Sequence, residues 1–304
     1  MAELLVYGIV LGSIIALGAV GLTLVFGILR FANFAHGDLM SAGAYVALFL
    51  VSGPLTWLGV PGSRFEPLSV GWRMLIAFPL AMLAVGLLAV AMDKIVFLPL
   101  RRKGSVPAIM AMAALGMSFI IRMTILIIWG PGFLFYNPGL IRPALKLPLG
   151  IRIRPDQILI VVTVLGLVAI LHSFLKKTKL GKAMRATADN KELAQISGIN
   201  VERIIAWTWG IGGAMAAAAG ILYGLDVQVQ PRMGWNFLLP LFAATILGSV
   251  GNMYGALIGG LVIGIAQQLS TAIILPAYKP AVAFIIMILI LLVRPQGIFG
   301  GRRK

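Results

Sequence analysis

The sequence predicts an all-α protein that crosses a membrane about eight times, with one or two broken or re-entrant segments. Hydrophobic residues make up 60% of the chain, charged residues make up 11%, and the mean hydropathy is +1.02. This composition is far too apolar for a soluble domain. The apolar residues gather in runs close to the roughly 20 residues that cross a hydrocarbon core. No stretch resembles a separate soluble domain, so we interpret residues 1–304 as one transmembrane domain.

The predicted spans follow one another with short polar connections. They lie at about 4–29, 38–52, 73–92, 106–128, 157–175, 203–225, 254–275 and 281–293. A further apolar run at 236–250 is too short for an ordinary span, and the sequence leaves open whether it crosses or re-enters. Residues 1–29 contain no Lys or Arg. They therefore lack the basic start of a cleaved signal peptide, and we expect them to form the first span.

The basic residues predict an orientation. With the N-terminus outside, sixteen of the 25 Lys and Arg residues fall on the cytoplasmic side, eight fall outside, and Arg122 lies within a span. This bias follows the positive-inside rule and places the C-terminus in the cytoplasm. The net charge of +16 is then a topology signal and does not indicate nucleic-acid binding. We interpret Arg122 as a side chain that snorkels toward the outer interface.

Two places interrupt the apolar pattern. The stretch "ILRFANFAHGDLMSAG" (28–43) concentrates polar residues between two apolar runs, and "FLLPLFAATILGSVGNMYGALIGG" (237–260) breaks near Gly248 and Gly251. Interrupted helices occur at membrane depth only where protein or a water-filled cavity satisfies the backbone. In transporters, paired broken segments point to the translocation path.

These interruptions supply the candidate path or gate residues, which are Asn33, His36, Asp38 and Asn252. An alternative stays open, in which 30–38 is a solvated cytoplasmic turn and Asn33 or Asp38 caps the next helix. The chain has no cysteine, and its two histidines, His36 and His172, are far apart. We therefore expect no metal site, no catalytic residue and no cofactor.

The polar segment 176–202 predicts a short amphipathic helix between two spans. Asp189 is the expected N-cap, with Glu192 three residues later as in a capping box. Gly198 stands where a left-handed C-terminal cap is expected. The apolar side of this helix consists of Leu193, Ala194 and Ile196. A helix of about two turns is unstable alone, so it needs a groove on the membrane domain or on a partner.

Several stretches carry a resemblance to a known family. They are "GLTLVFGILRFANFAHGDLMSAGAY" (21–45), "GKAMRATADN" (181–190), "ISGINVERI" (196–204), "GGAMAAAAGILYG" (212–224), "LGSVGNMYGALIGGLVIGIAQQL" (247–269) and "VRPQGIFG" (293–300). Together they resemble the high-affinity branched-chain amino acid permeases of bacterial ABC importers, over nearly the whole chain. Departures lie mainly in 53–72 and 131–156. The segment 176–203 is similar to the coupling loop of such permeases, although it lacks a doubled Ala after Glu192.

The resemblance implies an inner-membrane importer with several partners. These are a second homologous permease, two cytoplasmic ATPases and an extracytoplasmic binding protein that delivers leucine, isoleucine or valine. It also implies that Asp189, Glu192, Leu193, Ala194, Ile196, Gly198 and Ile199 couple the chain to an ATPase. The chain itself has no G-x-x-x-x-G-K-[ST] phosphate loop, so the energy must come from a partner. Relatives that carry urea, amides or other amino acids keep the substrate open.

Two other classes of function make different demands on the sequence. A stand-alone secondary transporter or channel calls for intramembrane acidic or paired charged residues, and the predicted spans offer almost none. A membrane enzyme calls for clustered histidines and carboxylates at one depth, which the sequence also lacks.

Overall fold

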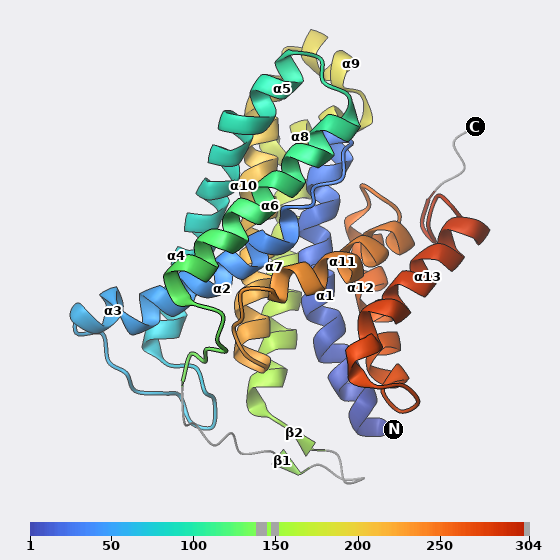
Figure 1. Ribbon diagram of the computed structural model, residues 1–304. Helices are drawn as coiled ribbons and strands as arrows, with labels where there is room; N and C mark the ends of the chain where they lie inside the picture. Colours follow the sequence, from blue (N-terminus) through green and yellow to red (C-terminus); the bar gives the residue numbers. More distant parts are fainter. Residues whose placement is uncertain (138–144, 147–151, 301–304) are drawn as a thin grey trace.

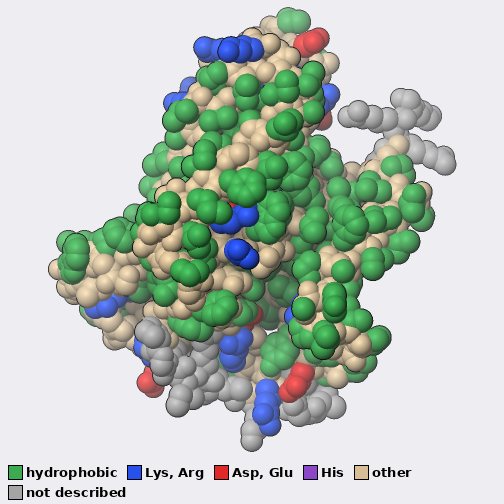
Figure 2. Space-filling model, in the orientation of Figure 1, with side chains coloured by type: hydrophobic (Ala, Val, Ile, Leu, Met, Phe, Trp, Pro, Cys, Tyr) green, Lys and Arg blue, Asp and Glu red, His purple; other side chains and the backbone are tan. Residues whose placement is uncertain are grey.

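The computed structural model describes residues 1–137, 145–146 and 152–300 of the chain, and this part is almost entirely helical (Figure 1). It contains eight helical stretches long and apolar enough to cross a membrane. The predicted fold class is confirmed. Hydrophobic side chains cover the flank seen in Figure 2, and most charged side chains on that face lie toward its two ends. Four cations of the topology count, Arg142, Arg302, Arg303 and Lys304, lie outside the described residues.

The helices have the following bounds: α1 Ala2–Leu29, α2 His36–Ser52, α3 Pro54–Trp57, α4 Trp72–Met92, α5 Leu98–Arg102, α6 Pro107–Trp129, α7 Pro155–Lys177, α8 Lys179–Asp189, α9 Lys191–Ile196, α10 Val201–Asp226, α11 Met233–Gly248, α12 Met253–Ser270 and α13 Lys279–Val293. A π-helical turn, Asp93–Phe97, joins α4 to α5, and a 3₁₀ turn, Pro276–Tyr278, precedes α13. Two short strands, β1 Leu145–Lys146 and β2 Arg152–Ile153, pair antiparallel.

The molecule has two ends along the helix axes. One end carries α5, α8 and α9 and is called the α9 end; the other carries Met1, β1 and β2 and is called the N-terminal end (Figure 1). α1 runs from the N-terminal end toward the α9 end, and α10 runs in the opposite direction beside it. α1 and α10 cross closely, because a Cβ at Gly21 would lie only 2.8 Å from the carbonyl oxygen of Gly212.

The core consists of two three-helix sets that run in opposite directions. α1, α2 and α4 form one set, and α10, α11 and α12 form the other. The first helix of each set packs along the third helix of the other set, so α1 lies on α12 and α10 lies on α4. Glycines allow both contacts, with Gly264 against Gly12 in one and Gly213 against Ala89 in the other. Small residues permit such close approach in a membrane, where lipid supplies no hydrophobic drive for association.

In the first set, the chain turns back into the molecule after α1 ends. Arg30 takes a left-handed conformation with φ 56° and closes α1. The residues that follow return alongside α1, because the His36 Nε2 atom lies 3.0 Å from the carbonyl oxygen of Gly18. Gly18 lies about 16 Å before Leu29 along the helix axis. Residues 30–35, which include the left-handed Arg30 and a turn at 34–35, cover this distance together with the His36 side chain, so α2 begins beside the middle of α1.

In the second set, the chain makes the same reversal from the other end. After α10, Val229 forms a backbone bridge to Leu134, with N–O distances of 2.8 and 2.9 Å. α11 then begins inside the molecule and runs to the α9 end, where the Gly251 amide donates to the Thr23 hydroxyl at 2.8 Å. The short run predicted at 236–250 therefore lies largely within the 16-residue α11, which starts inside the molecule after the irregular segment 227–232.

The contact between α2 and α10 gives a direct test of the packing. A Cβ at Gly220 would lie 1.9 Å from the carbonyl oxygen of Met40, which belongs to the backbone and cannot move aside. We expect Gly220→Ala to lower the free energy of unfolding by at least about 1–3 kcal/mol, as in other overpacked cores. The measurement is thermal unfolding of the purified protein in detergent.

A matched control is Gly166→Ala on α7, where a Cβ would meet nothing within 4 Å. This change should leave the stability unchanged or raise it slightly, because Ala favours a helix over Gly. Equal melting temperatures for the two variants would contradict the close contact.

Candidate functional site

The amino-terminal ends of α2 and α11 meet inside the molecule. Gly37 of α2 and Gly234 of α11 touch through their backbones, since a Cβ at Gly37 would lie 2.3 Å from the carbonyl oxygen of Gly234. Ser41 joins the two helices, because its Oγ accepts from the Gly234 amide at 2.9 Å and donates to the Pro231 carbonyl at 3.4 Å. Both helices therefore direct their partially positive ends into one buried place at membrane depth.

Residues 31–38 lie inside the protein and not in solvent. Asn33, His36 and Asp38 are each fully buried, and α2 has no side-chain cap. The Asn33 Oδ1 atom instead accepts from the Ala35 amide at 3.1 Å, within the turn. The alternative of a solvated cytoplasmic turn is therefore wrong. The residue after His36 must be glycine, because a side chain at position 37 would displace α11.

Two polar atoms of this cluster have no partner among the described residues. They are Nδ2 of Asn33 and Nδ1 of His36. Since the carbonyl oxygen of Gly18 can only accept, the facing His36 Nε2 carries the proton and Nδ1 is left as an acceptor. A free donor and a free acceptor are thus buried at membrane depth, where unmet hydrogen-bonding groups are costly.

Arg122 is part of the same cluster, and its predicted snorkelling is wrong. Its guanidinium donates to the Asp38 carboxylate through Nη2 at 2.8 Å and Nε at 3.1 Å. Ser118, one turn earlier on α6, bonds to both Asp38 and Arg122. Only 8% of Arg122 is exposed. A bidentate partner in the interior outweighs the gain from reaching the interface, because it satisfies both charges where water is absent.

Arg122 also connects α2 and α11, which we call the half-helices because each begins inside the molecule. While its guanidinium binds Asp38 of α2, its carbon Cζ lies 4.4 Å from the ring centroid of Trp235 at the start of α11 and 5.3 Å from that of Phe119. A cation over aromatic faces is attracted by their quadrupoles. One side chain of α6 therefore holds the first turns of α2 and α11 together.

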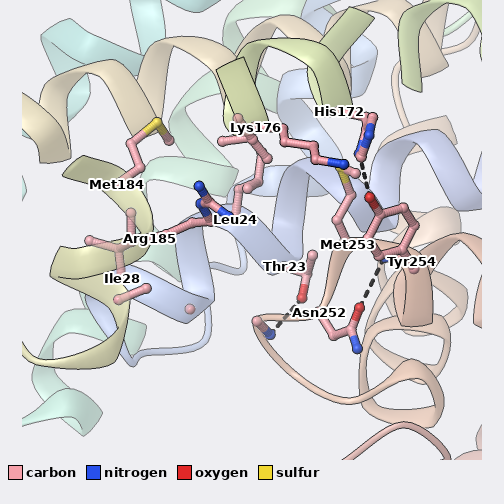
Figure 3. A pocket seen from close by; sticks show the side chains of 14 residues that line it. Thr23, Leu24, Ile28, His172, Lys176, Met184, Arg185, Asn252, Met253 and Tyr254 are labelled. Atoms are coloured by element: carbon pink, nitrogen blue, oxygen red, sulfur yellow. Dashed lines mark hydrogen bonds between the residues drawn. The ribbon is translucent and has the colours of Figure 1, made fainter. Parts of the chain in front are cut away.

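Asn252 lies apart from these residues. Its Oδ1 atom accepts from the amides of Tyr254 and Gly255 and so caps α12. It lines a cavity of about 490 Å³ at the α9 end, between α1, α7, α8 and the start of α12 (Figure 3). The structure thus brings Asn33, His36 and Asp38 together and places Asn252 elsewhere.

The segment between α7 and α10 contains the predicted short helix, with one correction. Asp189 is the last residue of α8, and Asn190 is the N-cap of α9, accepting from the Leu193 amide at 3.0 Å. Glu192 is then only two positions after the cap, one short of a capping box. Asn190 is the cap because Asp189 still belongs to α8, a helix not predicted from the sequence, whereas Asn190 has the extended backbone of a cap residue. Gly198 adopts the predicted left-handed conformation with φ 83°.

The apolar residues of α9 divide between two directions. Ala194 is buried against the protein, whereas Leu193 and Ile196 are 61% and 84% exposed. Ile199 is half-buried just after the glycine turn. Beside α9 lies a cavity of about 390 Å³ that is lined by Asp189 and Glu192 together with residues of α1 and α5. α9 lies at one end of the molecule (Figure 1), and two of its large apolar side chains, Leu193 and Ile196, are exposed there.

Sequence reasoning missed the second half of the central cluster. The segment "DVQVQPRMGW" (226–235) lies between predicted spans, and the predicted orientation counts Arg232 among the outer cations. Yet the segment contacts Gly37 and Ser41 at the start of α2. The available signal was the same combination of polar residues and glycine between apolar runs that marks 28–43. In the described part of the chain, no group of three or more metal-ligating side chains comes together.

Comparisons with known proteins give consistent results. The family described as "Branched-chain amino acid transport system / permease component" matches residues 4–291. The high-affinity branched-chain amino acid transport system permease protein LivH of Escherichia coli (strain K12) is 34% identical over 96% of this chain and 93% of its own length. The corresponding BraD protein of Pseudomonas aeruginosa is 33% identical over 97% and 94%. A probable branched-chain amino acid transport permease of Methanocaldococcus jannaschii is 29% identical over 96% and 90%. No solved structure matches the chain.

The buried ion pair predicts an asymmetric double-mutant result. Arg122→Gln leaves the Asp38 carboxylate buried without its cation, and we expect the free energy of unfolding to fall by about 3–5 kcal/mol. Adding Asp38→Asn removes the uncompensated charge and should recover much of this loss. The measurement is thermal or denaturant unfolding in lipid nanodiscs. If the double variant is as unstable as the sum of the two single variants, the pair is not coupled.

Proposed function

The chain belongs to the family of branched-chain amino acid transport system permease components, and on that premise we propose that it is the permease subunit of an ATP-driven importer for branched-chain amino acids. The observation that supports this most directly is the meeting of two half-helix ends, at Gly37 and Gly234, in the middle of the membrane. Transporters place substrate paths at such breaks between oppositely oriented sets of helices. The chain is a multi-pass membrane protein, and its role is transport, with catalysis left to partner subunits.

In the proposed orientation, the N-terminal end faces outward and the α9 end faces the cytoplasm of a bacterial inner membrane. The basic residues 176, 177, 179, 182, 185 and 191 all belong to the segment that forms the α9 end, in agreement with the positive-inside rule. The C-terminal residues return to the same end, since the Ile298 amide donates to the Leu247 carbonyl at 2.8 Å. In the proposed orientation, the end of α11 and residues 297–300 therefore lie on the cytoplasmic side.

The proposed substrate path passes the cluster of Asn33, His36 and Asp38. The free donor on Asn33 and the free acceptor on His36 suit weak, transient contacts with a zwitterion that has an apolar side chain. Strong binding is unnecessary here, because capture belongs to the extracytoplasmic binding protein. Asn252 is proposed for a gate at the cytoplasmic side, where it holds the turn between α11 and α12.

The proposed coupling element is α9 with its flanking residues. Leu193 and Ile196 supply an exposed apolar face, and Gly198 reverses the chain directly after it. Ala194 packs this helix against the protein, and Asp189, Glu192 and Ile199 are proposed to complete the surface that contacts the ATPase. Two cytoplasmic ATPases, a second homologous permease and the binding protein complete the proposed importer.

A second candidate is a stand-alone transporter driven by an ion. The pair of Asp38 and Arg122 favours it, because paired intramembrane charges are typical of ion-coupled transport. Reconstitution separates the two functions. Leucine uptake that requires the ATPases and the binding protein supports the importer, and uptake by this chain alone supports the second candidate. Competition by urea or short amides would identify a different substrate of the same family.

The coupling role predicts a selective defect. Leu193→Glu with Ile196→Glu places charges on the proposed docking face, so we expect loss of ATPase binding and at least a tenfold fall in uptake by proteoliposomes, roughly 1.4 kcal/mol or more of coupling. The matched control is Gln195→Glu, which adds a charge to the same helix without removing an apolar contact. Wild-type uptake in the double variant would refute the docking role.

The path assignment predicts changes in thiol accessibility. The chain has no cysteine, so an introduced thiol is its only reactive one. We expect a water-soluble maleimide to label Asn33→Cys and Trp235→Cys in the assembled importer and to do so faster during ATP turnover, because the path then admits water. Val162→Cys, 59% exposed on the apolar flank of α7, should stay unlabelled. Equal and slow labelling at all three positions would exclude a path through the cluster.

A further inference from the structure

The cavity at the α9 end combines an apolar wall with basic groups that have no partners. Leu24 and Ile28 of α1, Leu175 of α7 and Met184 of α8 form most of its wall. Lys176 and Arg185 also line it, and neither forms an ion pair or a hydrogen bond with any described residue. Figure 3 shows these two side chains extending beside the cavity from α7 and α8. No residue that lines this cavity is acidic.

A third positive contribution comes from the start of α12. Asn252, Met253 and Tyr254 line the cavity with the first turn of this 18-residue helix, whose amino-terminal end carries a partial positive charge. The hydrogen bond between Tyr254 and His172 fixes the opposite wall. Lys176 and Arg185 thus face one hollow beside the start of α12, whose Tyr254 and Gly255 amides are already capped by Asn252, and neither cation has a partner in the described chain.

The depth of the cavity indicates which anion fits. Thr23 to Ile28 form the last two turns of α1, and His172 to Lys176 form the last turns of α7, so the cavity opens where two spans leave the hydrocarbon core. A ligand at this level meets an apolar wall below and cations above. Basic pockets between helices at this level are typical of sites for anionic lipid headgroups.

We propose that this cavity binds the phosphate headgroup of an anionic phospholipid, with Lys176 and Arg185 as its charge partners and the α1 and α7 wall in contact with the acyl chains. The volume of about 490 Å³ lies within the range of small-ligand pockets, roughly 300–1,000 Å³. The inference rests on the proposed orientation only in that it assigns the site to the cytoplasmic leaflet, where anionic lipids attract basic segments.

The proposed lipid would link two parts of the fold that are far apart in sequence. α8 leads directly into α9, and the start of α12 follows the turn held by Thr23 and Gly251. A phosphate between Arg185 and the α12 terminus would therefore connect the proposed coupling segment to the second set of helices. Its removal should loosen α8 without affecting the central cluster at Gly37 and Gly234.

The test measures lipid binding to the purified full chain by native mass spectrometry after exchange into phosphatidylglycerol or phosphatidylcholine. We expect one tightly retained phosphatidylglycerol per chain and no equivalent retention of phosphatidylcholine. Neutralising the pair with Lys176→Gln and Arg185→Gln should weaken retention about fivefold per cation removed. The matched control, Lys179→Gln with Lys182→Gln, removes the same charge from the same segment outside the cavity and should retain the lipid.

Two further arms keep the result decisive. Ala188→Trp fills the cavity while keeping both cations, and it should also abolish retention; retention at the wild-type level would overturn the site. Inorganic phosphate and glycerol phosphate, added at the same concentration, should not raise the melting temperature, and protection equal to that of the lipid would assign the site to a free anion instead. Because these readouts measure binding, they stand apart from any failure of the chain to transport amino acids.

Discussion

The fold depends on satisfying backbone that leaves helical geometry at membrane depth. Residues 30–35 and 227–232 enter the protein as irregular backbone outside the helices, where each unmet amide or carbonyl costs several kcal/mol. Lipid cannot supply partners, so each segment must be surrounded by protein. The two oppositely oriented sets of helices achieve this by placing the start of α2 beside the start of α11. Ser41 of α2 bonds to the backbone of Pro231 and Gly234 and so joins the two. The remaining spans then serve as the enclosing wall.

This constraint explains why small residues stand where they do. Gly37 and Gly234 touch because the half-helices must approach closely enough to share Ser41 and Arg122. Asp38 in the first turn of α2 is stabilised twice, by the partially positive helix end and by the guanidinium. Arg122 in turn lies over Trp235 of the other half-helix. Arg122, a buried charge that would be costly without a partner, thus joins α2 of the first set to α11 of the second set through its contacts with Asp38 and Trp235.

Much of the fold could be predicted from the sequence because hydropathy determines spans locally. The polar cluster at 28–43 was recognisable for the same reason. The partner of Arg122 was not, since Asp38 lies 84 residues away on a different helix and only tertiary contacts bring them together. The re-entry at 226–235 was missed because polar residues between two apolar runs are equally typical of an outer loop. Asn190 and not Asp189 is the cap because Asp189 is still helical, and the exact end residue of a helix is poorly determined by sequence.

The position of α10 suggests how the proposed coupling element, α9, communicates with the proposed substrate path at the starts of α2 and α11. α10 begins five residues after the end of α9, packs along α1, α2 and α4, and ends where the re-entrant segment 227–232 starts. A force applied to Leu193 and Ile196 therefore reaches α10 through a short connection. Because Gly220 holds α10 against the Met40 backbone, α10 cannot move without shifting α2. Any displacement of α9 is thus delivered to both half-helix ends at once, which is the geometry that a gate at Gly37 and Gly234 requires.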